Sequence, residues 1–453
     1  MADPPPTRLH IDLPMDQWQV TPRNGRTNPV IATGHQPYFW HPGILAKYIA
    51  AKVLAEKLGG TTSYVVVDHN PLPPLSIDIP LHQGDKLSVR SVRLDSRAQA
   101  GSVPPNRLPP LGRGQAIGLL HEAATRNIPG FIRDGLQAIA QGYEHDQVEH
   151  GDLSEQTQAV SVLIEPMLGG IGGGTNSIVT ALFLDRLLAD PINAVRCYNR
   201  AAAAYPEADI RQLYLGRDVV EVPLWAQDKA TVTPVYADLG DSKRTQLFTT
   251  AHNSHLDLVG SEKLGYLRPR AITLSAIMRS ERCDLFIHGT GGGIYDQVTE
   301  LWWKDWVGEE LAPKAVVSAD VYLPFEVPVA TQEQRIHAQW FAHHLPHNVD
   351  RFTDAQHEVE AGLRQEKRDL LDRMNEDRDK RRRSKAFQRV HAINAEIAQL
   401  HADVLHNAAG RAGETKLGVD NAAIARRRDW CFTLYPTEHI DELKRLIETA
   451  LIR

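Results

Sequence analysis

The stretch "IATGHQPYFWHPGILAKY" at residues 31–48 decides how this chain begins to fold. An apolar run at residues 30–33 predicts a short buried strand, and from Pro42 onward the apolar residues recur near the helical period. Proline suits the first turn of a helix, and the glycine pair at residues 59–60 suits its end. A second apolar run, "YVVV" at residues 64–67, predicts another strand. Because the connection is long enough for a crossover, we expect the two strands to be parallel, in an α/β fold.

The composition is that of a globular protein with more than one compact unit. The chain has 453 residues, of which 42% are hydrophobic, enough to bury two or three cores. Its net charge of −6 gives no reason to expect a nucleic-acid partner. Cys197, Cys283 and Cys431 are far apart and show no CxxC spacing, which favours neither disulfides nor a zinc site. Without a signal-like N-terminus or a long apolar run, we expect a cytoplasmic protein with no membrane partner.

The pattern of segments predicts four regions. Residues 1–70 form the first part of an α/β core, and residues 71–160, rich in proline and glycine punctuation, form an inserted segment. Residues 161–325 complete the core, with a further insertion near residues 200–265. Residues 326–453 are expected to form a helical region followed by the C-terminal segment.

Two glycine-rich segments precede predicted helices. For "MLGGIGGG" at residues 167–174, a phosphate cradle and a flexible link before a helix are both open interpretations. The second segment follows an apolar run at residues 283–287 that predicts a strand. Its glycines leave backbone N–H groups unobstructed at the positive end of a helix, which suits a phosphate or a carboxylate. The residues concerned are Gly289, Thr290, Gly291, Gly292 and Gly293.

His35 and His41 flank the aromatic turn in front of the first helix. A single histidine at a helix start is most often a cap or a packed ring. As a pair, with Gly34 and Gly43 clearing backbone space, they suit hydrogen bonding to phosphoryl oxygens as charge develops. We interpret Tyr38, Phe39 and Trp40 between them as a core anchor of the turn rather than a lid over a ligand.

Asp68 and His69 follow the second predicted strand. Open α/β sheets bind ligands at the carboxyl ends of their strands. We therefore expect both side chains to face the same crevice as the histidine pair.

The last third of the chain carries two apolar stripes separated by a charged stretch. Two helical arms or one long helix would each explain the pattern, and each suits a hairpin or a coiled-coil dimer. We interpret Arg381, Arg382 and Arg383 between the stripes as an exposed helical face rather than a polyanion site. The stripes consist of Val359, Leu363, Leu370 and Met374, and of Val390, Ile393, Ile397, Leu400 and Val404.

Three of these segments together resemble one enzyme family. "TGHQPYFWHPGILAKYIAAKVLA" at residues 33–55 is similar to the N-terminal motif of the bacillithiol-biosynthesis cysteine-adding enzymes, and "VVVDHN" stands where that family has a strand ending in an EDHD-like sequence. "LRPRAITLSAIMRSERCDLFIHGTGGGIYDQV" resembles the family's RP, GGPGEIAYW and following Q pattern. The matching residues there are Arg268, Pro269, Gly289, Gly291, Ile294, Tyr295 and Gln297.

The resemblance implies a fold and a reaction. It implies a Rossmann-like parallel-sheet core of the nucleotidylyltransferase and class I synthetase type, with inserted segments and a C-terminal coiled coil that forms a homodimer. That superfamily has an HxGH-type signature where this chain has His41, Pro42, Gly43 and Ile44, so the second histidine is missing. The family joins cysteine to the amine of glucosaminyl-malate. An ATP-dependent ligase or nucleotidyl-transfer enzyme is therefore expected, with ATP or ADP and Mg²⁺, acting on an amino acid and an amine.

The resemblance also implies roles for particular residues. The catalytic set is expected to be His35, His41, Asp68 and His69. The nucleotide phosphates are expected on Gly34, Gln36, Gly43, Gly289, Thr290, Gly291, Gly292 and Gly293. The substrate is expected on Arg268, Tyr295 and Gln297, and no metal ligand is assigned.

Several residues depart from the family pattern. Gly292 stands in place of a glutamate, His35 in place of a glutamine, and Asn70 in place of an aspartate. Losing carboxylates removes candidates for holding an ammonium group or acting as a base. The amino acid or amine is therefore expected to differ from the family's substrates. The alternative is a catalytically silent paralogue that acts as a dimeric coiled-coil binding or scaffold protein.

Overall fold

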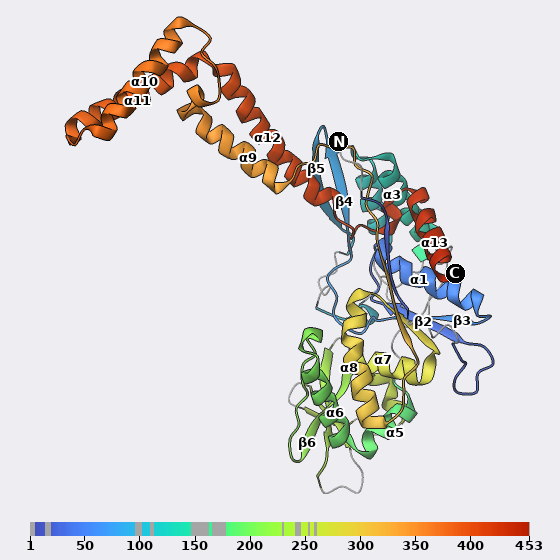
Figure 1. The fold of residues 1–453 in the computed structure, drawn as a ribbon. Helices are drawn as coiled ribbons and strands as arrows, with labels where there is room; N and C mark the ends of the chain where they lie inside the picture. Colours follow the sequence, from blue (N-terminus) through green and yellow to red (C-terminus); the bar gives the residue numbers. More distant parts are fainter. Residues whose placement is uncertain are drawn as a thin grey trace. The chain divides into compact units, whose positions relative to one another are not determined.

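The computed structural model divides the chain into two compact units (Figure 1). It describes residues 5–13, 20–95, 102–108, 113–145, 163–164, 178–228, 231–240, 246–251, 254–257 and 261–452. The larger unit comprises Pro5–Pro80, Val89–Leu323 and Arg428–Arg453. The described residues of the smaller unit are Leu81–Ser88 and Pro324–Arg427. The glycine-rich segment at residues 167–174 lies outside the described residues.

A mixed five-stranded sheet forms the centre of the larger unit. Its strand order is β1-β12-β11-β2-β3, and β12, β11, β2 and β3 run parallel while β1 pairs antiparallel to β12. The strands predicted at residues 30–33, 64–67 and 283–287 are confirmed. The five strands are β1 (Arg8–Asp12), β2 (Val30–His35), β3 (Thr61–Val66), β11 (Leu285–His288) and β12 (Lys314–Asp320).

Two helices connect the parallel strands in opposite directions across the sheet. Helix α1 (Pro42–Lys57) leads from β2 to β3, and helix α8 (Thr290–Val307) leads from β11 to β12. Since β2 and β11 are neighbours, their connections diverge, which leaves a crevice between the carboxyl ends of these two strands. The predicted end of α1 is confirmed, because Gly59 follows the C-cap with a φ of 63° that favours glycine.

Helix α1 is buried on nearly every side, as its apolar sequence requires. Leu45, Tyr48 and Ile49 are fully or almost fully buried. Trp40 stacks on Tyr48 with ring centroids 4.1 Å apart, so it anchors the turn before α1 as predicted. Helix α13 (Thr437–Ile452) packs on α1 and accepts, through the carbonyl of Leu451, a hydrogen bond from Nζ of Lys57 (2.7 Å).

A second sheet of the larger unit is antiparallel, with strand order β10-β6-β7-β8-β9. Its strands β6 and β7 form a hairpin within the insertion expected near residues 200–265. Its strands are β6 (Val219–Asp228), β7 (Thr231–Asp238), β8 (Gln246–Ala251), β9 (Ser254–Asp257) and β10 (Leu267–Pro269). The helices beside it in the sequence are α5 (Ala181–Ala189), α6 (Pro191–Ala204) and α7 (Ala271–Ile277). Trp302 of α8 is buried and donates from Nε1 to the carbonyl of Ala194 in α6 (3.0 Å), so it serves packing.

Residues 71–160, predicted as an insertion, supply a hairpin and two helices. The elements are β4 (Ser76–Gln83), β5 (Lys86–Arg93), α2 (Arg113–Ala124) and α3 (Gly130–His145). Helix α3 packs closely on residues near the C-terminus, because a Cβ built on Gly135 would lie 2.1 Å from the backbone oxygen of Thr433. Arg428–Arg453 accordingly belongs to the larger unit.

The smaller unit is largely helical. The first predicted stripe lies on one helix, whereas the second continues onto the following helix, where Val404 lies. Its helices are α9 (Gln332–His344), α10 (Glu358–Glu376), α11 (Lys380–Leu400) and α12 (Ala402–Ala425). Helices α10 and α11 are broken at residues 377–379 and pair through Arg389 Nε and Glu366 Oε1 (2.7 Å), so two arms form rather than one long helix. Three arginines near the tip, Arg381, Arg382 and Arg383, are exposed, as interpreted.

The apolar stripes are partly as predicted. Ile393 and Ile397 are buried in one cluster, against which Leu363 packs, so much of the seam is covered within one chain. The prediction is wrong for Val359 and Leu400, which are 74% and 43% exposed. These two residues lie in the first turn of α10 and at the last position of α11, where the neighbouring helix no longer covers them.

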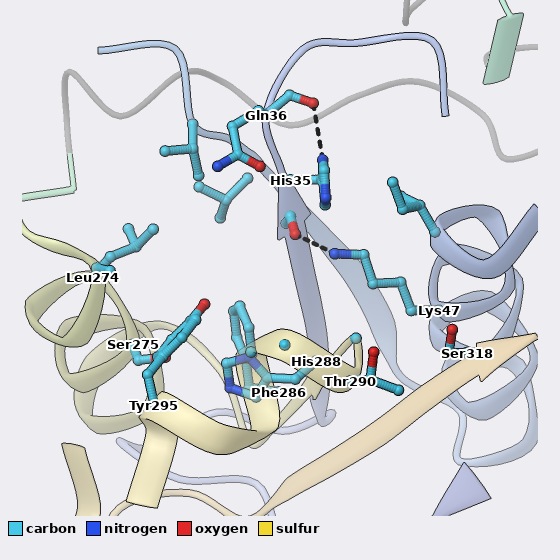
Figure 2. A pocket seen from close by; sticks show the side chains of 18 of the residues that line it. His35, Gln36, Lys47, Leu274, Ser275, Phe286, His288, Thr290, Tyr295 and Ser318 are labelled. Atoms are coloured by element: carbon cyan, nitrogen blue, oxygen red, sulfur yellow. Dashed lines mark hydrogen bonds between the residues drawn. The ribbon is translucent and has the colours of Figure 1, made fainter. Parts of the chain in front are cut away.

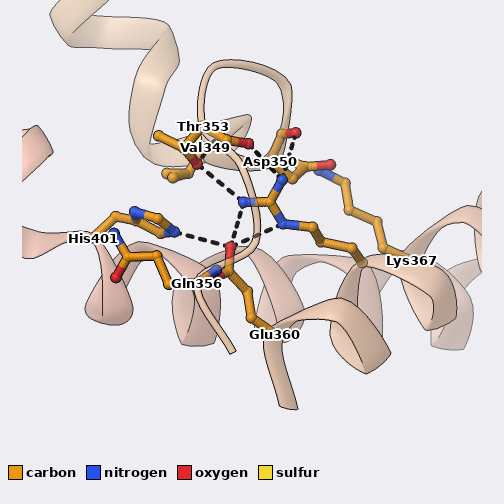
Figure 3. A network of polar contacts seen from close by, with 8 residues as sticks. Val349, Asp350, Thr353, Gln356, Glu360, Lys367 and His401 are labelled. Carbon is orange, nitrogen blue, oxygen red and sulfur yellow. Dashed lines mark hydrogen bonds and ion pairs between the residues drawn. The ribbon is translucent and has the colours of Figure 1, made fainter. Parts of the chain in front are cut away.

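A buried polar network joins α10 to the end of α11 (Figure 3). Glu360 is fully buried and accepts hydrogen bonds from Nε of Arg364 (2.8 Å) and from the backbone N–H of Gln356 (2.9 Å). Nε2 of His401 lies 2.9 Å from the same carboxylate. Arg364 also donates to the backbone oxygen of Asp350 (3.1 Å). The network fixes the joint at which α11 ends and α12 begins.

Two further expectations concern the chain as a whole. Cys197, Cys283 and Cys431 carry free, buried thiols. Among the described residues, no helix has the length and apolar character needed to cross a membrane.

Candidate functional site

A cavity of about 440 Å³ lies at the carboxyl ends of β2, β3 and β11 (Figure 2). Its wall comes from the ends of these strands, the first turns of α1 and α8, part of α7, and Ser318 of β12. It therefore lies in the crevice at which the connections of β2 and β11 diverge. The volume falls in the range of small-molecule sites.

The start of α1 brings His41 to the cavity. His41 is the N-cap of α1, and its Nδ1 accepts a hydrogen bond from the N–H of Gly43 (3.1 Å). A Cβ on Gly43 would lie 2.8 Å from the backbone oxygen of Ala319 and 2.9 Å from Oγ of Ser318, so only glycine lets α1 approach β12 this closely. Burial lowers the pKa of His41. The cap interpretation is confirmed, and the same imidazole also lines the cavity.

The end of β2 supplies His35 and Gln36. Gly34 precedes them, and a Cβ there would lie 2.6 Å from the backbone oxygen of Val65 in β3. Nδ1 of His35 lies 3.2 Å from the backbone oxygen of Gln36. Burial lowers the pKa of His35 to about 3, so its imidazole is neutral at pH 7. Since a carbonyl oxygen only accepts, the neutral ring carries its proton on Nδ1, and Nε2 is left as an acceptor for a ligand.

Lys47 is a cavity residue that the sequence reasoning missed. It extends from α1 with only 4% of its surface exposed, and Nζ donates to the backbone oxygen of Gly34 (2.5 Å). Burial lowers its pKa to about 7. The signal in the sequence was a lysine within an otherwise apolar helical stretch. Such a lysine is buried when its helix is covered on all sides.

The first turn of α8 carries the second glycine segment. Gly289 is the N-cap and Gly293 donates to its carbonyl (3.1 Å), so the residues predicted as a loop form the first helical turn. A Cβ on Gly292 would lie 2.6 Å from Nδ1 of His288, and one on Gly293 would meet Val316 at 2.7 Å. These contacts leave no room for a side chain at either position, but Gly292 also lines the cavity, whereas Gly293 is not among its described lining residues.

The other two glycines of this turn have a different environment. A Cβ on Gly289 or on Gly291 would meet nothing within 4 Å, and both residues line the cavity together with Thr290. The N–H groups of this turn that make no intrahelical hydrogen bond are therefore accessible to a ligand.

His288, the last residue of β11, is a second cavity residue that was missed. Its Nε2 lies 3.1 Å from Oδ2 of Asp296, which also accepts a hydrogen bond from Arg279 (2.5 Å). Burial lowers the pKa of His288, against the opposing effect of Asp296. The histidine at the end of the apolar run "LFIH" was the signal available in the sequence.

The two residues after β3 are placed differently from each other. His69 is buried and lines the cavity, and burial, followed by the nearby Arg268, lowers its pKa to about 4. Asp68 is buried but is not among the described lining residues. Arg268 is also behind the wall, because it donates to Oε1 of Gln227 (2.8 Å) and to the backbone oxygen of Gly265 (2.6 Å). Its guanidinium is thus engaged by the second sheet.

The two predicted substrate residues of α8 point apart. Tyr295 lines the cavity, and burial raises its pKa to about 12, so the phenol stays protonated. Gln297 lies two residues later, about 200° further around the helix. It lines another cavity, of about 400 Å³, beside Arg279 and Glu300. The structure therefore does not bring Gln297 to the site.

The polar wall of the cavity suits an anion. Its basic side chains are Lys47 and four histidines, Tyr295 adds a protonated phenol, and no aspartate or glutamate is among the lining residues that the structure describes. The N-termini of α1 and α8 add partial positive charge. Within the described ranges, no group of three or more His, Cys, Asp or Glu residues is arranged to hold a metal ion. The four histidines are His35, His41, His69 and His288.

No protein-family model matches this chain, and a search of curated proteins finds no match. The function is therefore argued from the residues of the cavity.

Proposed function

We propose that the chain is an ATP-dependent ligase or nucleotidyl-transfer enzyme that joins an amino acid carboxylate to an amine, similar to the cysteine-adding enzymes of bacillithiol biosynthesis. One observation carries the proposal. The cavity at the carboxyl ends of the parallel strands has cationic or neutral donor groups, two helix N-termini, and no carboxylate among its described lining residues. This is the arrangement that receives phosphate groups.

The strand order supports the finer fold assignment. The parallel strands follow the order β12-β11-β2-β3, and the chain turns in opposite directions after β2 and β11. A Rossmann-like core of the nucleotidylyltransferase type binds its nucleotide at such a point. We therefore propose that the larger unit is built on this type of core.

The proposed chemistry needs stabilisation of charge more than it needs a protein nucleophile. In nucleotidyl transfer, the carboxylate oxygen of the amino acid forms a bond to the α-phosphorus, and the bond to the pyrophosphate oxygen breaks. Negative charge then increases on the departing phosphates. The neutral imidazole of His41, whose Nδ1 accepts from Gly43 and whose Nε2 therefore carries the proton, is placed to donate a hydrogen bond to those oxygens, together with the N–H groups of the first turn of α8. The imidazole of His35 is placed to accept a hydrogen bond from the ligand through Nε2. The amine then attacks the acyl carbon, and the nucleoside monophosphate leaves.

Magnesium is expected with the nucleotide rather than from protein ligands. This cation binds through carboxylates and phosphate oxygens. The described lining residues supply hydroxyls, imidazoles and an amine but no carboxylate. Phosphate oxygens would thus be its ligands on this wall.

The test uses the purified full chain. Titration calorimetry with ATP and with ADP should give saturable binding. A screen of amino acids with candidate amines, in the presence of ATP and magnesium, should give pyrophosphate or ADP together with a condensed product by mass. A folded protein that neither binds nucleotide at millimolar concentration nor consumes it would contradict the proposal and support the silent paralogue.

Substitution of the histidines separates chemistry from folding. His35→Ala and His41→Ala should lower turnover far more than they lower the melting temperature. His41→Asn is the matched control for the second residue, because asparagine also caps helices. It should keep the stability of α1 while turnover stays low.

A further inference from the structure

The amine of Lys47 is buried in the cavity without an anionic partner among the described lining residues. Among the described residues, its hydrogen-bond acceptor is a backbone oxygen, that of Gly34. An ammonium group has three donors, so the remaining two are available to a ligand. Figure 2 shows the side chain reaching from α1 toward the open side of β2. A buried cation with this environment is costly unless an anion joins it.

The imidazoles around Lys47 become cations when they are protonated, and none of them carries a negative charge. His35 at the end of β2, His41 at the start of α1 and His288 at the end of β11 each interact unfavourably with the Lys47 charge. The first turn of α8 adds its own positive end. A bound anion would therefore be attracted by the protonated amine and by the first turn of α8, while the neutral imidazoles add no negative charge.

The cavity has two different sides. In Figure 2, Thr290 and Ser318 lie on the same side as Lys47, and Leu274 and Tyr295 lie on the opposite side. The first side offers an amine and two hydroxyls, while the second offers an aliphatic side chain and a ring. A ligand that fits both sides has a multiply charged anionic end and a planar, weakly polar end.

We propose that Lys47 is the phosphate-binding residue of this cavity and that the ligand is a nucleotide, with its phosphate chain at Lys47 and its base against Leu274 and Tyr295. The inference rests on the proposed function for the identity of the ligand as a nucleotide. The phosphate role of Lys47 rests on the cavity alone. The positive charge of Lys47 also excludes the ammonium group of an amino acid from this end of the cavity, because two cations would then be buried together.

The experiment compares three variants with the wild-type full chain. Calorimetry measures the binding of ATP, inorganic pyrophosphate and adenosine to wild type, Lys47→Met, Lys47→Arg and Leu274→Ala. Lys47→Met should weaken ATP and pyrophosphate about tenfold or more and leave adenosine unchanged. Lys47→Arg keeps the charge and should retain most of the affinity. Leu274→Ala should weaken ATP and adenosine but not pyrophosphate.

A folding readout accompanies the binding data. Because the buried amine is costly in the empty cavity, the melting temperature of ligand-free Lys47→Met should not fall. If this variant does not fold, comparison of Lys47→Arg with Lys47→Gln provides the same test of charge.

The outcomes separate the inference from the proposed function. Equal affinity of wild type and Lys47→Met for ATP and pyrophosphate would overturn the role of Lys47 while the nucleotide function stands. If the wild type binds pyrophosphate but neither ATP nor adenosine, and Lys47→Met loses the pyrophosphate binding, the result would support the phosphate-binding role of Lys47. It would overturn the proposal that the ligand is a nucleotide. Failure of wild type to bind either phosphate compound would overturn both.

Discussion

Nε2 of His288 lies 3.1 Å from Oδ2 of Asp296, and the two side chains are 3% and 0% exposed. The carboxylate also accepts a hydrogen bond from Arg279, which is equally buried. Asp296 therefore lies against a cavity imidazole and balances the charge of a buried guanidinium at the same time. Burial alone would raise the pKa of Asp296, but His288, Arg279 and Lys314 hold it well below its usual range.

Replacing Asp296 should be strongly destabilising. Asp296→Ala leaves the charge of Arg279 buried without its main partner, which should lower the free energy of unfolding by about 3–5 kcal/mol. Urea denaturation at pH 7 measures the change. Glu300→Gln is the matched control, since Glu300 contacts the same arginine but is 41% exposed, and its loss should cost about 1 kcal/mol or less.

The contribution of Asp296 to the free energy of unfolding should decrease at low pH. The pKa of Asp296 is lower in the folded than in the unfolded protein, so its contribution is present above the unfolded pKa and is lost as the pH falls. The gap in stability between wild type and Asp296→Ala should thus narrow at acidic pH. A gap that is constant or that widens would contradict this account.

Two adjacent glycines of α8 should respond oppositely to alanine. Gly291→Ala places a methyl group in open cavity space, so folding should be unaffected or stabilised by about 0.5–1 kcal/mol, while pyrophosphate binding weakens. Gly292→Ala forces a methyl group to 2.6 Å from Nδ1 of His288, which should cost about 1–3 kcal/mol. Denaturation and calorimetry measure the two effects. Full pyrophosphate affinity in Gly291→Ala would show that the ligand does not reach the first turn of α8.

Anion affinity should fall as the pH rises above neutrality. The pKa of Lys47 is lowered to about 7 in the empty cavity, whereas a bound anion favours the protonated amine and raises that pKa. Sulfate is a suitable probe because its own charge does not change between pH 6 and 9. Its dissociation constant should be lowest below about pH 7 and rise by up to about tenfold per pH unit above it.

Above pH 7 the neighbouring groups keep their charge. Burial lowers the pKa of His35 to about 3 and that of His69 to about 4, lowers those of His41 and His288, and raises that of Tyr295 to about 12, so the amine is the group that changes charge there. Lys47→Arg should therefore give sulfate binding that is nearly independent of pH. A wild-type profile that is flat, or an arginine profile as steep as that of wild type, would contradict the assignment.

The joint of the smaller unit should depend on Glu360. Burial raises the pKa of this carboxyl, but hydrogen bonds from the backbone of Gln356, from His401 and from Arg364 outweigh it and lower the pKa to about 2. Glu360→Ala leaves Arg364 buried without its carboxylate, which should destabilise the smaller unit by about 3–5 kcal/mol. Hydrogen exchange of amides in α10 and α11 localises the change.

An exposed pair on the same two helices is the control. Glu366→Gln breaks the ion pair with Arg389 on the surface of the hairpin and should change exchange much less. Since the pKa of Glu360 is lowered on folding, its contribution is present above about pH 4.5 and is lost as the pH falls toward about 2. Equal protection of α10 in both variants would show that the buried network does not hold the joint.

Local sequence was sufficient for the elements that surround the cavity. The apolar runs predicted β2, β3 and β11, and the proline and glycine signals predicted both ends of α1. The two histidines that flank the turn before α1 were recognised from residue type and spacing, and both line the cavity. Such signals are readable because strand alternation, helical period and capping depend on residues a few positions apart.

Side-chain direction was less predictable within an element. Tyr295 and Gln297 were both assigned to the substrate, yet the turn of α8 places only Tyr295 in the cavity. Arg268 was chosen for its charge, but Gln227 and Gly265 of the larger unit engage its guanidinium. These outcomes depend on partners that come from other parts of the chain.

The sequence by itself determined that a strand is followed by a helix, with a turn between them that contains histidines and glycines, because strand, turn and cap are local properties. Only the tertiary structure decided that Lys47 is buried beside that corner and that His288 arrives there from β11. The pairing of β2 with β11 joins segments far apart in the chain. The burial of an amine depends on what packs around it, which no local pattern records.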